Sequence, residues 1–454
     1  MAQRYFFPKA ILFLLGLFLC TVAPLGTYAY AQSCETSYEV VLKLREPRIG
    51  SYNVWDANYG GPLGDEKFVG GVTLESGNVV LAGEVSGLFQ GRDGKTNTGK
   101  QRLLLTMLDR RGRVLWDRAL DIENLLAVRH MQKIGAQFII AADVGGTRSR
   151  GAIWIGMFDQ EGELLKHTKL DHKEMSLSAA AMITAHDGKS LMLAVSATDI
   201  SGKVPDYGLV YNVSASGKVL GSRAYRPGPA SNIKGLSLGA NGGYIATGWM
   251  ANEQGGQNGW IMGLGPQTTI LWQKEIPRGR FAHVHDAAPV KNAYGRDQIM
   301  ALGEVSTAGG EQKAAWLFMI DTLNKELVWQ RYFTDVHKLS GRAIMAHGDN
   351  QYSVMLDSDG KQSAQYDEFV RLLSVNERGT ILGAQNYFQG RGAHGLALFE
   401  GFNRERMIAG YSNAEYIDEM ASVAPDEDPK KIKSHDGWVI AAPRPNSYND
   451  PCRR

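Results

Sequence analysis

The chain has few cysteines, almost no net charge and one long apolar run. Three cysteines occur among 454 residues, and 49 basic residues nearly balance 47 acidic ones. Nucleic acids and anionic membranes attract proteins with a basic field, so this balance argues against both as the main partner. Beyond the first apolar stretch, no run reaches the roughly eighteen residues that a membrane-spanning helix needs. We therefore expect no nucleic-acid partner and no membrane span in the mature chain.

A helical pattern is missing as well. After the first apolar stretch, apolar residues do not recur with the helical period of about 3.6 residues. Short apolar runs, rich in β-branched and aromatic residues, alternate with turns that contain Gly, Asn or Asp, and this pattern favours β-strands. In the first repeat these runs are Phe68–Leu74, Val79–Val85, Arg102–Leu108 and Arg113–Leu120.

A unit of four such runs recurs seven times. An anchor residue in the second run advances along the chain by 59, 53, 53, 55, 53 and 54 residues. The anchors are Gly83, Ala142, Val195, Gly248, Gly303, Leu356 and Gly410. A fixed period near this length is typical of a propeller or another repeat array. The sequence thus predicts an all-β fold, a seven-bladed β-propeller of four-stranded antiparallel blades.

The last repeat lacks a fourth strand, because Pro443 and Pro445 follow its third run and proline cannot donate to a strand ladder. Near the N-terminus, Val54-Trp55-Asp56 matches the fourth-strand pattern of the first repeat. We predict that this N-terminal strand completes the last blade and closes the ring. The expected blades are residues 68–120, 126–170, 177–225, 233–275, 284–333, 340–387, and 394–442 plus 51–58.

Tryptophan recurs in the fourth strand. Trp116, Trp272 and Trp329 hold the same place in their repeats, where a large ring can fill the wedge between neighbouring blades. On these residues the chain resembles secreted bacterial β-propeller repeat proteins and, more distantly, the tryptophan-bearing blades of quinoprotein-type propellers. It differs from quinoprotein dehydrogenases, which usually have eight units, and its turn is one residue shorter.

The N-terminus has the layout of a cleavable secretory signal. Arg4 and Lys9 precede the apolar stretch Ala10–Ala23, and small residues lead to Ala31, where we expect cleavage. The mature domain, residues 32–454, would then be periplasmic or secreted. It keeps Cys34 and Cys452 near its two ends, and an oxidising compartment together with ring closure predicts a disulfide between them.

Basic residues recur near the starts of the first strands, which line the central channel of a propeller. They are Arg129, Lys234, His283, His285, Arg342 and His394, and Asp286 accompanies the two histidines of the fifth repeat. Together they could bind an anion or a metal ion at the channel mouth. The alternative is a solvated polar lining, which we favour, and we assign no metal site and no cofactor.

The loops between second and third strands vary most and share one face of a propeller. Two of them gather charges that could dock a partner. The candidate partner-binding residues are Arg92, Asp93, Lys95, Asp418, Glu419, Lys430 and Lys431.

These features favour a non-enzymatic scaffold that binds an envelope protein or a glycan through the long-loop face. Two alternatives remain. One is a secreted enzyme that acts on a polysaccharide or another polymer, with His283, His285, Asp286 and Arg342 as candidates. The other is a quinone-cofactor oxidoreductase, which the tryptophan-bearing blades suggest.

Overall fold

The computed structural model describes residues 38–43, 53–61, 64–87, 89–90, 96–97, 99–145, 150–291, 297–307, 313–334, 338–348, 350–359, 368–390, 392–417 and 431–445. The chain divides into two units, and all of these residues belong to the second, Thr36–Arg454. Nearly all of the regular structure in these ranges is β-strand, and a 3-10 turn, η2, spans Ala240–Gly242. No helix in the described ranges has the length and hydropathy needed to cross a bilayer.

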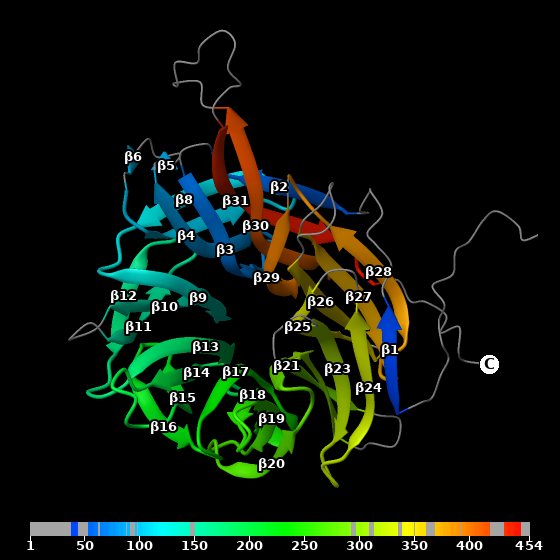
Figure 1. Cartoon of the computed structure of the whole chain (residues 1–454). Helices are drawn as coiled ribbons and strands as arrows, with labels where there is room; N and C mark the ends of the chain where they lie inside the picture. Colours follow the sequence, from blue (N-terminus) through cyan, green and yellow to red (C-terminus); the bar gives the residue numbers. More distant parts are fainter. Residues whose placement is uncertain are drawn as a thin grey trace, which may run out of the picture. The chain divides into compact units, whose positions relative to one another are not determined.

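Five sheets have four strands each (Figure 1). They are β3(Gly64–Thr73), β4(Val79–Gly87), β7(Arg102–Leu108), β8(Val114–Leu120); β9(Leu125–Ile134), β10(Gln137–Gly145), β11(Gly151–Phe158), β12(Leu164–Leu170); β13(Ser176–Thr184), β14(Ser190–Thr198), β15(Tyr207–Ser214), β16(Val219–Tyr225); β25(Lys338–His347), β26(Gln351–Asp359), β27(Val370–Asn376), β28(Ile381–Tyr387); and β29(Ala393–Glu400), β30(Arg406–Ile417), β31(Lys431–Ala442) with β2(Trp55–Tyr59).

The remaining long strands form one nine-stranded sheet. Its members are β17(Ser231–Leu238), β18(Tyr244–Ala251), β19(Gln257–Leu264), β20(Ile270–Ile276), β21(Phe281–Lys291), β22(Asp297–Ser306), β23(Lys313–Asp321), β24(Leu327–Thr334) and β1(Glu39–Lys43). A separate short hairpin pairs β5(Phe89–Gln90) with β6(Thr96–Asn97).

The prediction of seven separate four-stranded blades is therefore wrong, since five four-stranded blades are present among the described strands. The physical reason is a joint in the nine-stranded sheet, where β19 pairs in parallel with β21 through Gln257 and Phe281. The backbone N–H of Gln257 also donates to the carbonyl of Arg280 at 2.9 Å. Because the sequence units look alike, their repetition does not reveal which neighbours share a ladder.

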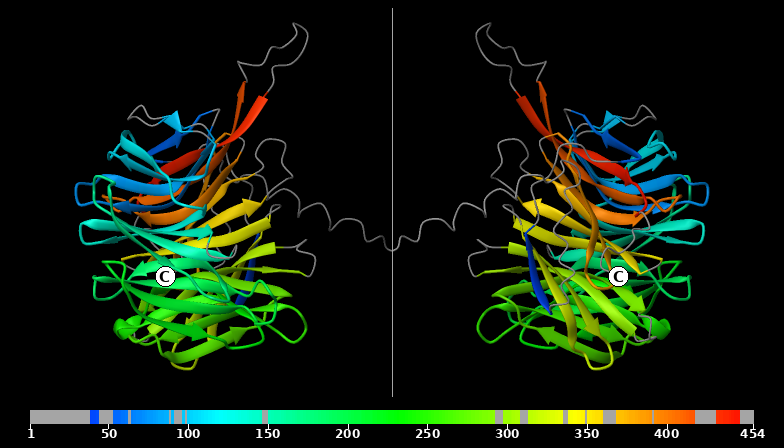
Figure 2. Two further views of the ribbon diagram at one scale, coloured as in Figure 1. Left: turned by 90° about the vertical axis from the view of Figure 1, so that its left-hand side faces the viewer. Right: turned by 90° about the vertical axis from the view of Figure 1, so that its right-hand side faces the viewer.

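The strand β1 was not predicted. It pairs in parallel with β24, from Glu39 opposite Gln330 to Lys43 opposite Thr334. Figures 1 and 2 show it in dark blue along the outer edge of β24. A parallel partner from a distant segment carries no local turn signal, so no sequence pattern indicated this pairing.

The first strands of successive repeats lie against one another in a closed order. The contacts run β3, β9, β13, β17, β21, β25, β29 and back to β3. Apolar clusters fill the space between neighbouring sheets, as where Val80 and Leu103 pack with Phe138 and Trp154. The fold is thus a β-propeller with its inner strands around one axis.

Two of the fourth-strand tryptophans, Trp116 and Trp329, pack against a neighbouring sheet, as expected, whereas Trp272 packs within the nine-stranded sheet. A side-chain carbon on Gly162 would lie 2.7 Å from the Trp116 ring, and one on Gly379 would lie 2.8 Å from the Trp329 ring. Both glycines have positive φ angles, 79° and 71°, in the turn between third and fourth strands of the next sheet. Glycine therefore serves both the turn and the close approach of the ring.

The N-terminal segment completes the sheet of β29–β31, as its sequence indicated. The strand β2 pairs antiparallel with β31, from Trp55 opposite Ala441 to Tyr59 opposite Gly437. The predicted signal peptide, Cys34 and Cys452 lie outside the described residues, so cleavage and the disulfide stay predictions.

Candidate functional site

Each inner strand has an irregular register at the same repeat position. One residue is left out of the ladder there, and a β-bulge of this kind re-aims a side chain. These residues are Val69, Arg129, Ala180, Lys234, His285, Arg342 and Leu396. Four of them are basic: we call Arg129, Lys234 and Arg342 the axial cations, and the fourth is His285. All four were candidates from the sequence, and the bulge is their common structural feature.

A second position, directly after the anchor of each second strand, carries several acids. Its residues are Glu84, Asp143, Ser196, Trp249, Glu304, Asp357 and Tyr411. Sequence reasoning overlooked them, although their fixed offset from the anchor was a usable signal. Each acid lies on the strand next to an inner strand, and Asp143, Glu304 and Asp357 are each close to the base at the bulge of that strand.

Asp143 is the partner of the first axial cation. The Arg129 Nε donates to Asp143 Oδ2 at 2.8 Å. From the next sheet, the Ser178 hydroxyl donates to the same oxygen at 2.7 Å, and the Ala179 N–H donates to Oδ1 at 2.8 Å. The Arg129 side chain is 46% exposed and that of Asp143 only 6%, so the cation faces solvent over a buried carboxylate.

Asp357 has the same role beneath Arg342. The Arg342 Nη2 lies 3.2 Å from Asp357 Oδ2, and their side chains are 39% and 1% exposed. Here the next sheet supplies His394, whose Nδ1 lies 3.2 Å from the same oxygen and whose Nε2 lies 2.9 Å from Glu368 Oε2. Burial lowers the pKa of His394, but the Asp357 and Glu368 carboxylates outweigh it and raise the pKa above its ordinary value.

Glu304 is shared by two imidazoles and an amine. His283 stands directly opposite it in the ladder, with Nδ1 3.6 Å from Glu304 Oε1. His285 Nε2 lies 3.6 Å from Oε2, and Lys313 Nζ lies 2.9 Å from the same oxygen. The His283 Nε2 meets Gln257 Oε1 at 2.5 Å. Among the described residues, the buried His285 Nε2 has no hydrogen-bond partner, which typically costs about 1–3 kcal/mol.

The protonation states in this cluster follow from burial and from the contacts between Glu304, the two imidazoles and Lys313. Burial lowers the pKa of His285, and Glu304 only partly opposes it, so the imidazole is neutral at pH 7. Burial alone would raise the pKa of Glu304, but the imidazoles and the Lys313 ammonium hold it well below its usual range. The ammonium of Lys313, 2.9 Å from Glu304 Oε2, thus adds to the effect of the imidazoles in keeping Glu304 ionised.

The axial cations act on one another across the repeats. Burial lowers the pKa of Lys234, Glu304 on the following repeat opposes this, and the charge of Arg129 adds to it. The Lys234 side chain is nevertheless exposed. It thus reaches water from a position surrounded by protein. His285 in turn is affected by the charge of Arg342. The four side chains therefore form one electrostatic unit, which we call the axial surface.

Asp286 does not join this surface. Its Oδ1 accepts the N–H of Ala287 at 2.8 Å, and its Oδ2 accepts the N–H of Ile344 on β25 at 2.9 Å. Burial raises its pKa to about 7 in spite of these bonds. The carboxyl therefore links two inner strands, which is a structural role.

A different acidic pair lies where β3 meets the last sheet. Burial, and after it the charges of Asp436 and Asp65, raise the pKa of Glu66 to about 8. A side-chain carbon on Gly60 would lie 2.7 Å from Glu66 Oε2 and 2.8 Å from Asp436 Oδ1, so both oxygens converge there.

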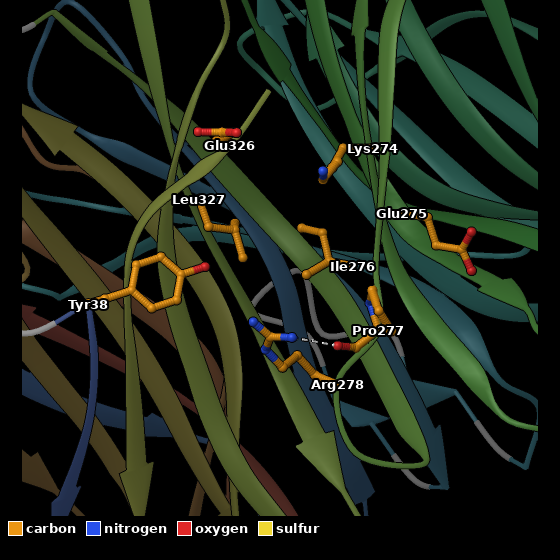
Figure 3. Close-up of a pocket in the computed structure, with 8 residues that line it drawn as sticks. All are labelled: Tyr38, Lys274, Glu275, Ile276, Pro277, Arg278, Glu326 and Leu327. Carbon is orange, nitrogen blue, oxygen red and sulfur yellow. Dashed lines mark hydrogen bonds between the residues drawn. The ribbon is translucent and has the colours of Figure 1, made fainter. Parts of the chain in front are cut away.

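A cavity of about 430 Å³ lies at the outer strands rather than at the axial surface (Figure 3). Its lining residues are Tyr38, Lys274, Glu275, Ile276, Pro277, Arg278, Glu326 and Leu327. The Arg278 guanidinium is held by the Pro277 carbonyl at 2.8 Å and by Gln330 Oε1 at 3.0 Å. Both basic and acidic side chains line this cavity, so it favours neither an anionic nor a cationic ligand.

The predicted partner-binding loops lie almost wholly outside the described residues. This applies to Arg92, Asp93, Lys95, Asp418, Glu419 and Lys430. Lys431 begins β31, where it pairs with Ile417 in a hairpin that projects beyond its neighbours (Figure 2). Their role in binding stays a prediction.

The sequence matches no protein-family model and no curated protein. Solved propellers are similar at low identity. The β-propeller domain of the Trilobed protease from Pyrococcus furiosus is 12% identical, with a TM-score of 0.42 over 88% of this chain and 98% of that one. A putative 6-phosphogluconolactonase from Bacteroides fragilis is 12% identical, with a TM-score of 0.44 over 70% and 83%. A puromycin hydrolase mutant is 15% identical, with a TM-score of 0.42 over 81% of this chain and 52% of the enzyme. At these scores none bears on function, and the β-propeller assignment rests on the strand order itself.

Proposed function

We propose that the protein is an exported, non-catalytic binding propeller that holds an acidic group of a protein or glycan at its axial surface. The observation that carries this is the layering of charge. Exposed guanidinium groups of Arg129 and Arg342 stand over the buried carboxylates of Asp143 and Asp357. The anchoring bond uses one edge of each guanidinium, so its other N–H donors remain on the exposed side.

Such an arrangement favours binding over catalysis. Asp143, Glu304 and Asp357 are each paired with a cation, so they serve as anchors and not as bases waiting for a proton. Cations held in place lose little freedom on contact with a ligand, which improves affinity and selects for charge. The sequence supports an exported setting through its N-terminal apolar stretch and Ala31.

Calorimetry with two acidic probes, oligogalacturonate and polyglutamate, tests the proposal, with a neutral oligosaccharide as the comparison. We expect an acidic probe to bind and its affinity to fall as salt rises, because salt screens exposed charges. Lys234→Gln removes a cation without leaving an anchored carboxylate behind, and it should weaken binding about threefold. With Arg129→Gln added, the loss should exceed about tenfold, since hydrogen bonds between charged groups contribute about 1.5–3 kcal/mol.

The matched control is Lys166→Gln on the exposed strand β12, which should bind as the wild type does. Thermal unfolding of each variant separates lost binding from lost fold. The proposal fails if neither acidic probe binds, or if Lys234→Gln and the double variant bind the probe as tightly as the control does.

A further inference from the structure

We infer that His283, His285 and Glu304 form a binding site for one divalent transition-metal ion of the zinc class. One ligand atom from each of these residues lies within 4.8 Å of the other two. His283 Nδ1 and His285 Nε2 are each 3.6 Å from a Glu304 oxygen. Metal–ligand bonds of about 2.0–2.2 Å in a tetrahedron place neighbouring ligand atoms roughly 3.3–3.6 Å apart. The two distances to Glu304 already match this spacing, and separations of up to 4.8 Å must contract by roughly 1 Å for the cluster to enclose the ion.

The backbone brings the three ligands together. His283 and Glu304 are opposite each other in the ladder, and the bulge at His285 frees its side chain from the regular alternation. The two imidazole rings meet edge to face, at 83° with centroids 6.2 Å apart. Gly303 allows the close approach, because a side-chain carbon there would lie 2.0 Å from the His283 carbonyl oxygen. The third ligand thus comes from the adjacent strand, not from a distant blade.

Gln257 orients the first ligand. Its Oε1 accepts a hydrogen bond only, so the His283 Nε2 must carry the proton and donate it. Nδ1 is then left with its lone pair directed to the Glu304 side. A metal-ligating histidine usually donates its other ring N–H to an oxygen in this way. The backbone of Gln257 is fixed by its pairing with Phe281, so the joint of the nine-stranded sheet also supports the site.

His285 supplies the second, independent indication. Its Nε2 is shielded from water and has no hydrogen-bond partner in the described part of the chain, although a carboxylate oxygen lies 3.6 Å away. A cation bound between His285 Nε2 and the Glu304 oxygen provides both atoms with a partner. Two imidazole nitrogens and one carboxylate suit zinc, cobalt or nickel better than magnesium or calcium, which prefer oxygen. Three protein ligands leave a position for water or for a ligand's acidic group.

Lys313 competes with the ion. Its Nζ lies 2.9 Å from Glu304 Oε2, the oxygen that also faces His285. A divalent ion must therefore displace the ammonium or share the carboxylate with it. This predicts modest affinity in the wild type and a gain when the charge of Lys313 is removed.

The test uses the tag-free mature chain, stripped with a chelator and titrated with Zn²⁺ in the absence of other ligands. We expect one ion per chain by calorimetry and by elemental analysis after dialysis. With Co²⁺ in place of Zn²⁺, we expect a visible absorption spectrum that indicates a low coordination number of the bound ion. His285→Gln and Glu304→Gln should each weaken Zn²⁺ binding more than about 100-fold. Gln257→Leu should weaken it about 10–100-fold. Lys313→Gln should strengthen it severalfold.

His167→Gln, on the exposed strand β12, is the matched control and should leave Zn²⁺ binding unchanged. Unfolding curves establish that each variant is folded. The inference is overturned if the wild type binds no stoichiometric Zn²⁺, or if a folded His285→Gln or Glu304→Gln variant binds like the wild type. A gain in Lys313→Gln supports it even where a ligand variant fails to fold. The inference does not depend on the proposed function, because the titration contains no acidic probe.

Discussion

The sheets β9–β12 and β25–β28 place the same two residue types at the same repeat positions and complete them differently. Arg129 over Asp143 matches Arg342 over Asp357. The next sheet adds the Ser178 hydroxyl to the first pair and the His394 imidazole to the second, again at equivalent positions. A hydroxyl keeps its charge at zero near neutral pH, whereas an imidazole exchanges a proton. The same repeat position therefore provides a hydrogen bond that does not change with pH in one sheet and a pH-dependent interaction in the other.

The two carboxylates also differ in how completely they are satisfied. Asp143 Oδ1 accepts the Ala179 N–H at 2.8 Å. Asp357 Oδ1 has no hydrogen-bond partner among the described residues. We infer that the Asp143 sector contributes mainly to stability, and that the Asp357 sector retains capacity for another donor, from water or from a ligand.

Asp143→Ala should have the largest effect, because it removes the bonds from Arg129, Ser178 and Ala179 at once. We expect the free energy of unfolding to fall by about 3 kcal/mol, since breaking a buried charged network is costly. Urea denaturation measures this loss. Asp56→Ala, at an exposed position of β2, should stay within about 0.5 kcal/mol of the wild type. An equally small loss in Asp143→Ala would remove the contrast between the sectors.

Glu66→Gln compares these paired acids with one that has acidic neighbours. Folding raises the pKa of Glu66 from 4.5 to about 8. Between these two pH values the folded chain therefore holds a proton that the unfolded chain has released. This contribution to stability is full below about pH 4.5 and is lost as pH rises through about 8. We expect the variant to be more stable than the wild type by about 1–2 kcal/mol near pH 8, and equal to it near pH 4.5. Thermal unfolding across that range tests this, and a constant difference would contradict it.

His394→Ser makes the second sector resemble the first. The raised pKa of His394 means that its contribution to stability is full below the ordinary value of 6.5 and is lost as pH rises through the folded-state pKa. We expect the variant to lose about 1 kcal/mol near pH 5.5 and less at about pH 8.5. Paired urea titrations at these two pH values measure the change. A loss that does not vary with pH would show that the imidazole acts only by packing.

The sequence predicted the strands, their turns and the inner position of the basic residues. The recurring anchor and the turn glycines are local signals, and each is written within one repeat. The joint at Gln257 and Phe281, the parallel strand β1 and the number of separate blades depend on contacts between repeats. No local pattern encodes such contacts.

Only part of the candidate site was predicted from the sequence. Arg129, Lys234, His285 and Arg342 were identified, but their shared bulge was not, because a bulge is a property of two strands in register. Glu304 was not predicted, because His283 and His285 share one strand and a third ligand was expected from a distant blade. The acid opposite them lies on the very next strand.

The pairing of β2 with β31 also sets an order of events during synthesis. The segment that begins at Trp55 leaves the ribosome before the other strands of this sheet, and its partner strand, β31, is the last of them to emerge. Until that strand emerges, the last sheet lacks its outer member and β2 remains an unpaired edge. A chain shortened before β31 would keep most of its repeats but leave β2 and β30 without their shared partner strand. Two unpaired strand edges would then be exposed, so we expect such fragments to aggregate.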